Sequence, residues 1–155
     1  MSMPEVVVLK KKSYLAMIEN SSKGENLMFR NLYAVVDGTE KDILKDGRLS
    51  CAVFASAVLY VNKLVKDVHG TVNGTEKDLI ESGWMEAKEI KPGAVLIWEE
   101  QLAPDGVLRR HVGFAMGNDE AVSNSSENGR VPKKHHITYD NTRQIEKIFW
   151  HPSLN

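Results

Sequence analysis

The fold is decided by the stretch Arg48-Leu49-Ser50-Cys51-Ala52-Val53-Phe54-Ala55-Ser56-Ala57-Val58-Leu59-Tyr60-Val61. It contains the only cysteine of the chain, at the point where a polar, glycine-marked segment changes into a long apolar run. Apolar residues repeat there every three or four positions, which predicts a helix over residues 50–65 with one buried stripe. Ser50 is expected at the N-cap, so that Cys51 takes the first helical position.

The composition is that of an ordinary globular chain. With 155 residues, 42% hydrophobic and 26% charged, the sequence predicts one domain over residues 1–155 with its own core. A net charge of -1 argues against nucleic acid or an anionic membrane as a partner. No apolar run approaches the roughly 20 residues of a membrane span, and the N-terminus does not resemble a signal peptide. A cytoplasmic location is the default expectation, with export by another route left open.

Helical elements come first along the chain, and strands follow. Helical spacing predicts a further helix over residues 11–20. Strands are expected at residues 30–36, 94–98, 107–116, 120–124, 135–139 and 145–150, with turns at 91–93, 103–106 and 117–119. This order predicts an α+β fold in which N-terminal helices, including the Cys-bearing helix, pack on a C-terminal antiparallel β-sheet.

One short sequence occurs twice: Gly38-Thr39-Glu40-Lys41-Asp42-Ile43-Leu44 is echoed by Gly74-Thr75-Glu76-Lys77-Asp78-Leu79-Ile80. In both copies the threonine resembles an N-cap, with an aspartate three residues later. We interpret the two copies as independent short helices with the same start signal, because nothing outside these windows matches.

Cys51 at a helix N-terminus is the candidate nucleophile. The first-turn N–H groups and the helix dipole favour an anion there, which is expected to lower the pKa of the thiol. The same N–H groups can stabilise an oxyanion. His111 is the candidate base. It shares a strand face with Gly113 and Ala115, whose small side chains are expected to leave space for a substrate. The alternative is a histidine that only fills a sheet face.

A third group should orient the imidazole of His111. If the hairpin turns on a two-residue Asn118-Asp119 loop, Gly113 faces Asn124, which then lies on the His111 face. A three-residue loop brings Ser123 to that face instead. Asn124 is favoured, because its carbonyl can accept from an imidazole N–H while its amide anchors to the backbone.

Four segments together resemble the NlpC-type cysteine peptidases, a family of the papain-like superfamily. Leu49-Ser50-Cys51-Ala52-Val53-Phe54 resembles the family's Asp-Cys-Ser-Gly-Phe motif, and Lys91-Pro92-Gly93-Ala94-Val95-Leu96-Ile97-Trp98 is similar to its Pro-Gly-Asp strand. His111-Val112-Gly113-Phe114-Ala115-Met116-Gly117-Asn118 resembles its His-Val-Gly-Ile-Tyr-Leu-Gly strand, and Ala121-Val122-Ser123-Asn124-Ser125-Ser126 matches the strand that follows. Ser50 and Ala94 stand where the family usually has Asp. In ungapped register, Ser123 stands where it usually has His.

The resemblance implies a papain-like core whose Cys–His dyad and polar third group cleave amide bonds, commonly in peptidoglycan peptides. The predicted activity is a cysteine peptidase or amidase that uses Cys51, His111 and either Asn124 or Ser123, acts on a peptide or peptidoglycan-like substrate, and needs no cofactor. The alternatives are a deamidase, acyltransferase or thioesterase with the same dyad, or a non-enzymatic binding module on this scaffold. The sequence leaves the oligomeric state open.

Four further residues are predicted to contact the substrate: Ser50, Trp98, His135 and His136. Trp98 ends a strand near the expected cleft. In a strand, the two adjacent histidines point to opposite faces, so either could line the cleft. A zinc site there would need a third ligand that no spacing suggests, and one cysteine excludes a multi-cysteine zinc site or an internal disulfide. No metal is expected.

Overall fold

The structure is a computed structural model that describes residues 1–103 and 105–155. In these residues, three α-helices accompany a six-stranded antiparallel sheet and a separate two-stranded sheet. The elements are α1 (Lys10–Ser21), β1 (Tyr33–Val36), β2 (Thr39–Asp42), α2 (Cys51–Val61), α3 (Val72–Glu81), β3 (Met85–Glu86), β4 (Val95–Leu102), β5 (Leu108–Gly117), β6 (Glu120–Asn124), β7 (Pro132–His136), β8 (Ile145–Trp150) and the short 3-10 helix η1 (Pro152–Leu154).

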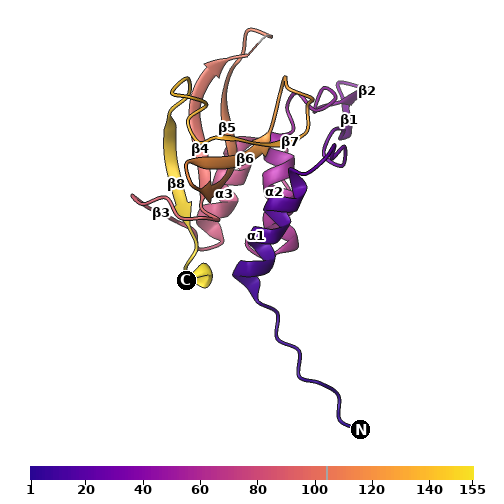
Figure 1. Cartoon of the computed structure of the whole chain (residues 1–155). Helices are drawn as coiled ribbons and strands as arrows, with labels where there is room; N and C mark the ends of the chain where they lie inside the picture. Colours follow the sequence, from indigo (N-terminus) through magenta and orange to yellow (C-terminus); the bar gives the residue numbers. More distant parts are fainter. Residues whose placement is uncertain (104) are drawn as a thin grey trace.

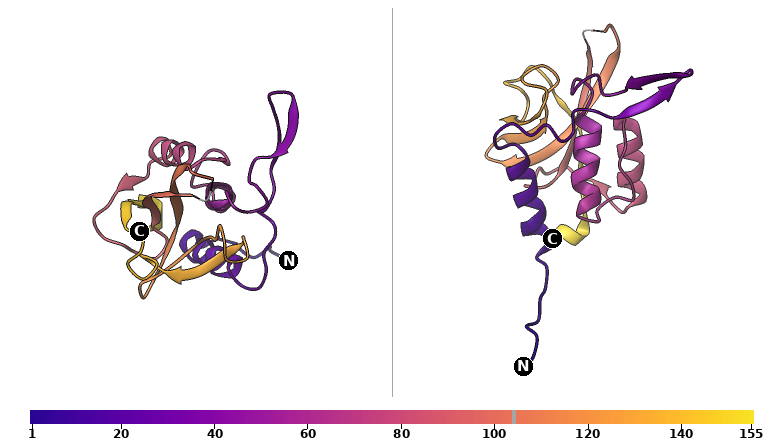
Figure 2. Two further views of the ribbon diagram at one scale, coloured as in Figure 1. Left: turned by 90° about the horizontal axis from the view of Figure 1, so that it is seen from above. Right: turned by 90° about the vertical axis from the view of Figure 1, so that its right-hand side faces the viewer.

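The large sheet has the strand order β3-β8-β4-β5-β6-β7, and the three α-helices gather on one side of it (Figure 1). The β1–β2 hairpin projects from the body near the start of α2 (Figure 2). The predicted α+β class, with helices packed on a C-terminal antiparallel sheet, is therefore confirmed.

Aromatic side chains join the helices to the centre of the sheet. Tyr14 of α1 and Phe54 of α2 are fully buried, and both rings meet Phe114 of β5 edge-on, at centroid distances of 5.9 and 5.8 Å. The Tyr14 hydroxyl donates to the Gly93 carbonyl at 2.8 Å, so that α1 also anchors the turn that leads into β4. These contacts fix the position of α2 relative to β5.

The helix that carries Cys51 is shorter than the sequence predicts. It ends at Val61 rather than at residue 65. Lys63 adopts a left-handed backbone, with φ of 57°, and the Leu64 N–H donates to the Leu59 carbonyl across it. This closure satisfies carbonyls at the helix end and turns the chain away, so that Leu64 is buried outside the helix.

The two copies of the echoed sequence fold differently, which corrects the prediction of two similar helices. The first forms β2, because the Asp42 carboxylate accepts from the N–H groups of Leu32, Leu44 and Asp46 and closes a turn there. The second lies inside α3, which begins at Val72 within an expected loop, with Thr71 rather than Thr75 as its N-cap.

The strands agree with the predicted regions but differ at their ends. β4 continues to Leu102, β7 covers residues 132–136 rather than 135–139, and β8 lies where residues 145–150 are expected to form a strand. Of the turn predicted at residues 103–106, Pro104 lies outside the described residues. Ala103 and Val107 are joined across it by a backbone hydrogen bond of 2.9 Å.

Candidate active site

Cys51 is the first residue of α2, as the sequence predicts, and its side chain is partly buried. The backbone N–H of Val112 on β5 lies near enough to the thiol to lower its pKa. The pairing of β5 with β6 ends at Phe114 and Val122, two residues from Val112 along β5. The start of α2 therefore lies near Val112, which follows His111 in the sequence.

The pKa of the Cys51 thiol is raised, which corrects the prediction that the helix start lowers it. Burial is the largest cause. The Val112 N–H, the charge of Arg143 and the N–H groups of Cys51 and Ala52 all act in the opposite direction, but burial outweighs them. The resting thiol is thus protonated at neutral pH, and attack requires a base that removes its proton.

His111 lies on β5 opposite Trp98 and is 9% exposed. Its ring centroid is 5.2 Å from that of Trp98. Burial, followed by the charges of Arg143 and His135, lowers the pKa of His111 from 6.5 to about 3. At neutral pH the imidazole is therefore neutral.

The space beside His111 is filled, contrary to the prediction that small residues leave it free for a substrate. A β-carbon placed on Gly113 would lie 2.7 Å from the Ser123 β-carbon and 3.1 Å from the Trp98 ring. Glycine is therefore required by the packing of these two side chains. Ala115, on the same face, is fully buried.

The hairpin brings Ser123, and not Asn124, to the imidazole. The two-residue Asn118-Asp119 turn is confirmed, because Gly117 pairs with Glu120. A register shift between Ala115 and Gly117, however, inserts one extra residue in β5 and reverses the expected parity.

As a result, the Ser123 Oγ lies 2.8 Å from the His111 Nε2. The Asn124 side chain instead donates to the Gly47 carbonyl at 2.9 Å, so the placement of Asn124 on the His111 face was wrong.

Ser123 is the centre of a polar cluster. Besides His111, its hydroxyl meets His135 Nε2 at 2.7 Å and the Tyr139 hydroxyl at 2.9 Å. The rings of His135 and Tyr139 stack with a centroid distance of 4.0 Å, and Trp98 lies against both. Burial raises the pKa of Tyr139 to about 12, so the phenol keeps its proton. No sequence pattern pointed to Tyr139 as a site residue.

Arg143 is a second residue that sequence reasoning missed. Its Nε donates to the Glu99 carbonyl at 3.0 Å and its Nη2 to the Arg109 carbonyl at 2.7 Å. A bulge between Trp98 and Gln101 takes Glu99 out of the β4–β5 pairing, which leaves its carbonyl free for this contact. Positive charge at Arg143 lowers the pKa of the Cys51 thiol and of His111.

The residues predicted to contact substrate occupy different environments. The Ser50 hydroxyl is buried and has no hydrogen-bond partner among the described residues, so Ser50 holds the N-cap position without capping through its side chain. Trp98 is fully buried, and its indole N–H donates to the Ile137 carbonyl at 2.7 Å, which leaves it no surface for a substrate. The exposed His136 accepts from the N–H groups of Thr138 and Asp140 and shapes the turn after β7.

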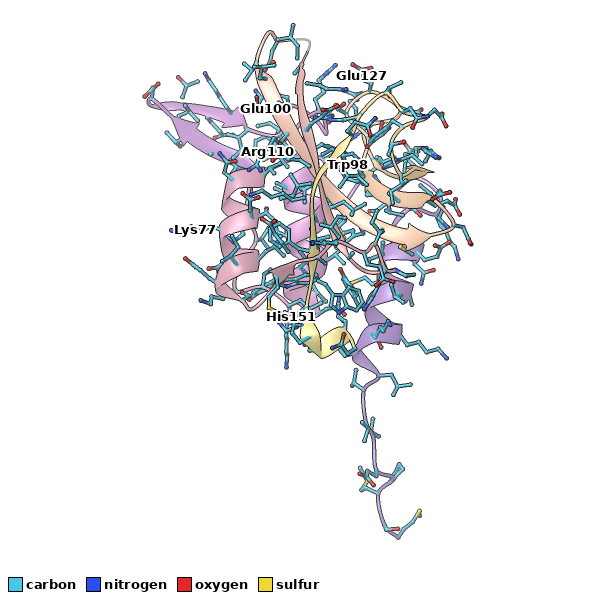
Figure 3. The ribbon with its side chains drawn as sticks, turned by 90° about the vertical axis from the view of Figure 1, so that its left-hand side faces the viewer. Lys77, Trp98, Glu100, Arg110, Glu127 and His151 are labelled. Atoms are coloured by element: carbon cyan, nitrogen blue, oxygen red, sulfur yellow. The ribbon has the colours of Figure 1, made fainter. Side chains whose placement is uncertain are left out.

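Salt bridges connect the elements around the site. Lys45, in the segment before α2, lies 3.3 Å from Asp105 in the β4–β5 turn. Arg110 of β5 lies beside one end of α3 in Figure 3 and pairs with Glu76 at 3.2 Å. Glu146 of β8 is also 3.2 Å from Arg110, so that one guanidinium links α3, β5 and β8.

Within residues 1–103 and 105–155, no three His, Cys, Asp or Glu side chains are grouped so that they could hold a metal ion. None of the helices in the same residues combines the length and apolar character that crossing a bilayer requires. Comparisons of the chain with protein-family models and with curated proteins found no match.

Proposed function

We propose that this protein is a papain-like cysteine hydrolase of the NlpC type, which cleaves an amide bond in a peptide substrate such as a peptidoglycan peptide. The observation that carries the proposal is the hydrogen bond between His111 Nε2 and Ser123 Oγ, in a fold that also places a thiol at the start of α2. A nucleophile at a helix N-terminus, a neutral imidazole and a polar group that orients it form the arrangement of a thiol hydrolase.

The reaction begins when neutral His111 takes the thiol proton and the Cys51 sulfur attacks the amide carbonyl. Because Nε2 is occupied by Ser123, the remaining ring nitrogen, Nδ1, accepts that proton. The tetrahedral oxyanion is stabilised by the backbone N–H of Cys51, which has no intrahelical acceptor. The imidazolium then protonates the leaving amine, and water releases the acid from the thioester while His111 again acts as base.

Arg143 stabilises the negative charge that forms on the Cys51 sulfur during the reaction. Its guanidinium is fixed by two backbone carbonyls, and its charge favours the thiolate over the thiol. The same charge opposes protonation of His111, so the imidazole is neutral at rest. The thiolate–imidazolium pair is consequently formed during the reaction rather than at rest.

The test is to incubate the protein with peptides and with purified peptidoglycan fragments, and to analyse the products by mass spectrometry. Hydrolysis of an internal amide gives two fragments with one added water, whereas deamidation and transfer to an added amine give different masses. Wild type, Cys51→Ala and His111→Ala are compared. His151→Ala is the matched control, because His151 lies at the η1 end of the molecule (Figure 3).

We expect both site variants to lose cleavage and His151→Ala to retain it. Full cleavage by Cys51→Ala would refute the proposal. If the wild-type protein cleaves no substrate and its Cys51 thiol does not react with iodoacetamide at any pH, a non-enzymatic binding module would be favoured instead.

A further inference from the structure

His135 has its hydrogen-bonding roles fixed by its partners. Its Nδ1 lies 2.7 Å from the His136 carbonyl oxygen, which can only accept, so Nδ1 carries a proton. Burial lowers the pKa of His135, which makes the neutral ring the form present at neutral pH. A neutral imidazole has one N–H, and Nε2 of His135 is therefore an acceptor.

The acceptor at His135 determines what the Ser123 hydroxyl does. A hydroxyl has one proton to donate, and His135 Nε2, at 2.7 Å, is the neighbour that can only accept it. The two remaining neighbours of Ser123 Oγ must then donate. These are the Tyr139 hydroxyl at 2.9 Å and His111 Nε2 at 2.8 Å.

We infer that His135 is a positioning residue, which acts through Ser123 to hold His111 as the Nε2–H tautomer with Nδ1 unprotonated. The hydrogen bonds run in one direction, from His111 to Ser123, from Ser123 to His135, and from His135 to the His136 carbonyl. A serine and the histidine of the next strand thereby do together what one orienting side chain does in a triad.

The inference rests on the proposed function for its catalytic consequence, but the tautomer can be observed without activity. With an acceptor at position 135, the Ser123 hydroxyl donates its one proton to that acceptor. Without that acceptor, the hydroxyl can rotate and donate to His111 Nε2, which moves the His111 proton to Nδ1. A proton on Nδ1 prevents that nitrogen from taking the thiol proton.

The experiment records long-range ¹H–¹⁵N NMR spectra of the histidine side chains of the ¹⁵N-labelled protein at neutral pH. His135→Phe removes the acceptor, and His135→Gln is the matched control, because its amide oxygen can accept from Ser123. Ser123→Ala, which removes the link itself, provides a second variant in case His135→Phe does not fold. Thermal unfolding establishes which variants are folded.

We expect the Nε2–H pattern for His111 in wild type and His135→Gln, and a shift toward Nδ1–H or a mixture in His135→Phe and Ser123→Ala. The rate of Cys51 alkylation by iodoacetamide should fall about 100-fold in His135→Phe, because general-base assistance by His111 is lost, and recover in His135→Gln. An Nδ1–H pattern in the wild type, or an unchanged Nε2–H pattern in a folded His135→Phe or Ser123→Ala variant, would overturn the inference. A confirmed tautomer without any hydrolysis would refute the proposed function alone.

Discussion

Replacing His111 with glutamine should remove part of the acid sensitivity of this protein. The pKa of His111 is about 3 in the folded protein against 6.5 as its ordinary value. Between these two values the unfolded chain binds a proton that the folded chain does not. The stabilisation is therefore fully present above about pH 6.5 and is lost as the pH falls toward about 3.

The size of the effect follows from the shift. At about pH 4 the pH lies roughly 2.5 units below the pKa of His111 in the unfolded chain. Protonation therefore stabilises the unfolded chain by about 3 kcal/mol, at 1.36 kcal/mol per unit. Glutamine cannot titrate, but it can still form a hydrogen bond with Ser123. All other ionisable groups remain in both proteins, so the difference between the two proteins isolates the contribution of His111.

The assay is urea unfolding of wild type and His111→Gln at several pH values from about 7.5 to about 4. The free energy of unfolding of the wild type, minus that of the variant, should decrease by about 3 kcal/mol over this range. If the two stability curves instead run parallel, His111 is solvated and protonated like an ordinary histidine, and the neutral buried base is refuted.

Two further predictions concern packing and charge. In Gly113→Ala the new β-carbon would lie 2.6 Å from the Val122 carbonyl oxygen, so we expect about 1–3 kcal/mol of destabilisation by urea unfolding. Gly70→Ala, which meets nothing within 4 Å, is the control, and equal stability of the two variants would contradict this packing. In Arg143→Gln the pKa of the Cys51 thiol should rise further, measured from alkylation rates across pH, and Arg143→Lys should restore it. Simple unfolding would move that pKa down toward its ordinary value, so a decrease would disprove this role of Arg143.

Local sequence determined where the main candidate residues lie along their elements. The three- to four-residue apolar repeat after Ser50 places Cys51 at a helix start, and the helix indeed begins there. The short polar pair Asn118-Asp119 predicts a two-residue turn, and both residues adopt the left-handed backbone that such a turn needs. These features depend on neighbours within a few positions, which a sequence displays directly.

Only the tertiary structure decided what surrounds these residues. The extra residue in β5 next to the turn changes which residues of β6 share a face with His111, so that Ser123 takes the place expected for Asn124. No local sequence pattern predicts such a bulge. Arg143 and Tyr139 reach the site from the segment between β7 and β8, through contacts with distant strands. The thiol pKa is likewise set by burial, which outweighs the helix N-terminus. Burial and strand register depend on contacts throughout the fold. For that reason the sequence located Cys51 and His111 but did not predict their pKa values or the partner of the imidazole.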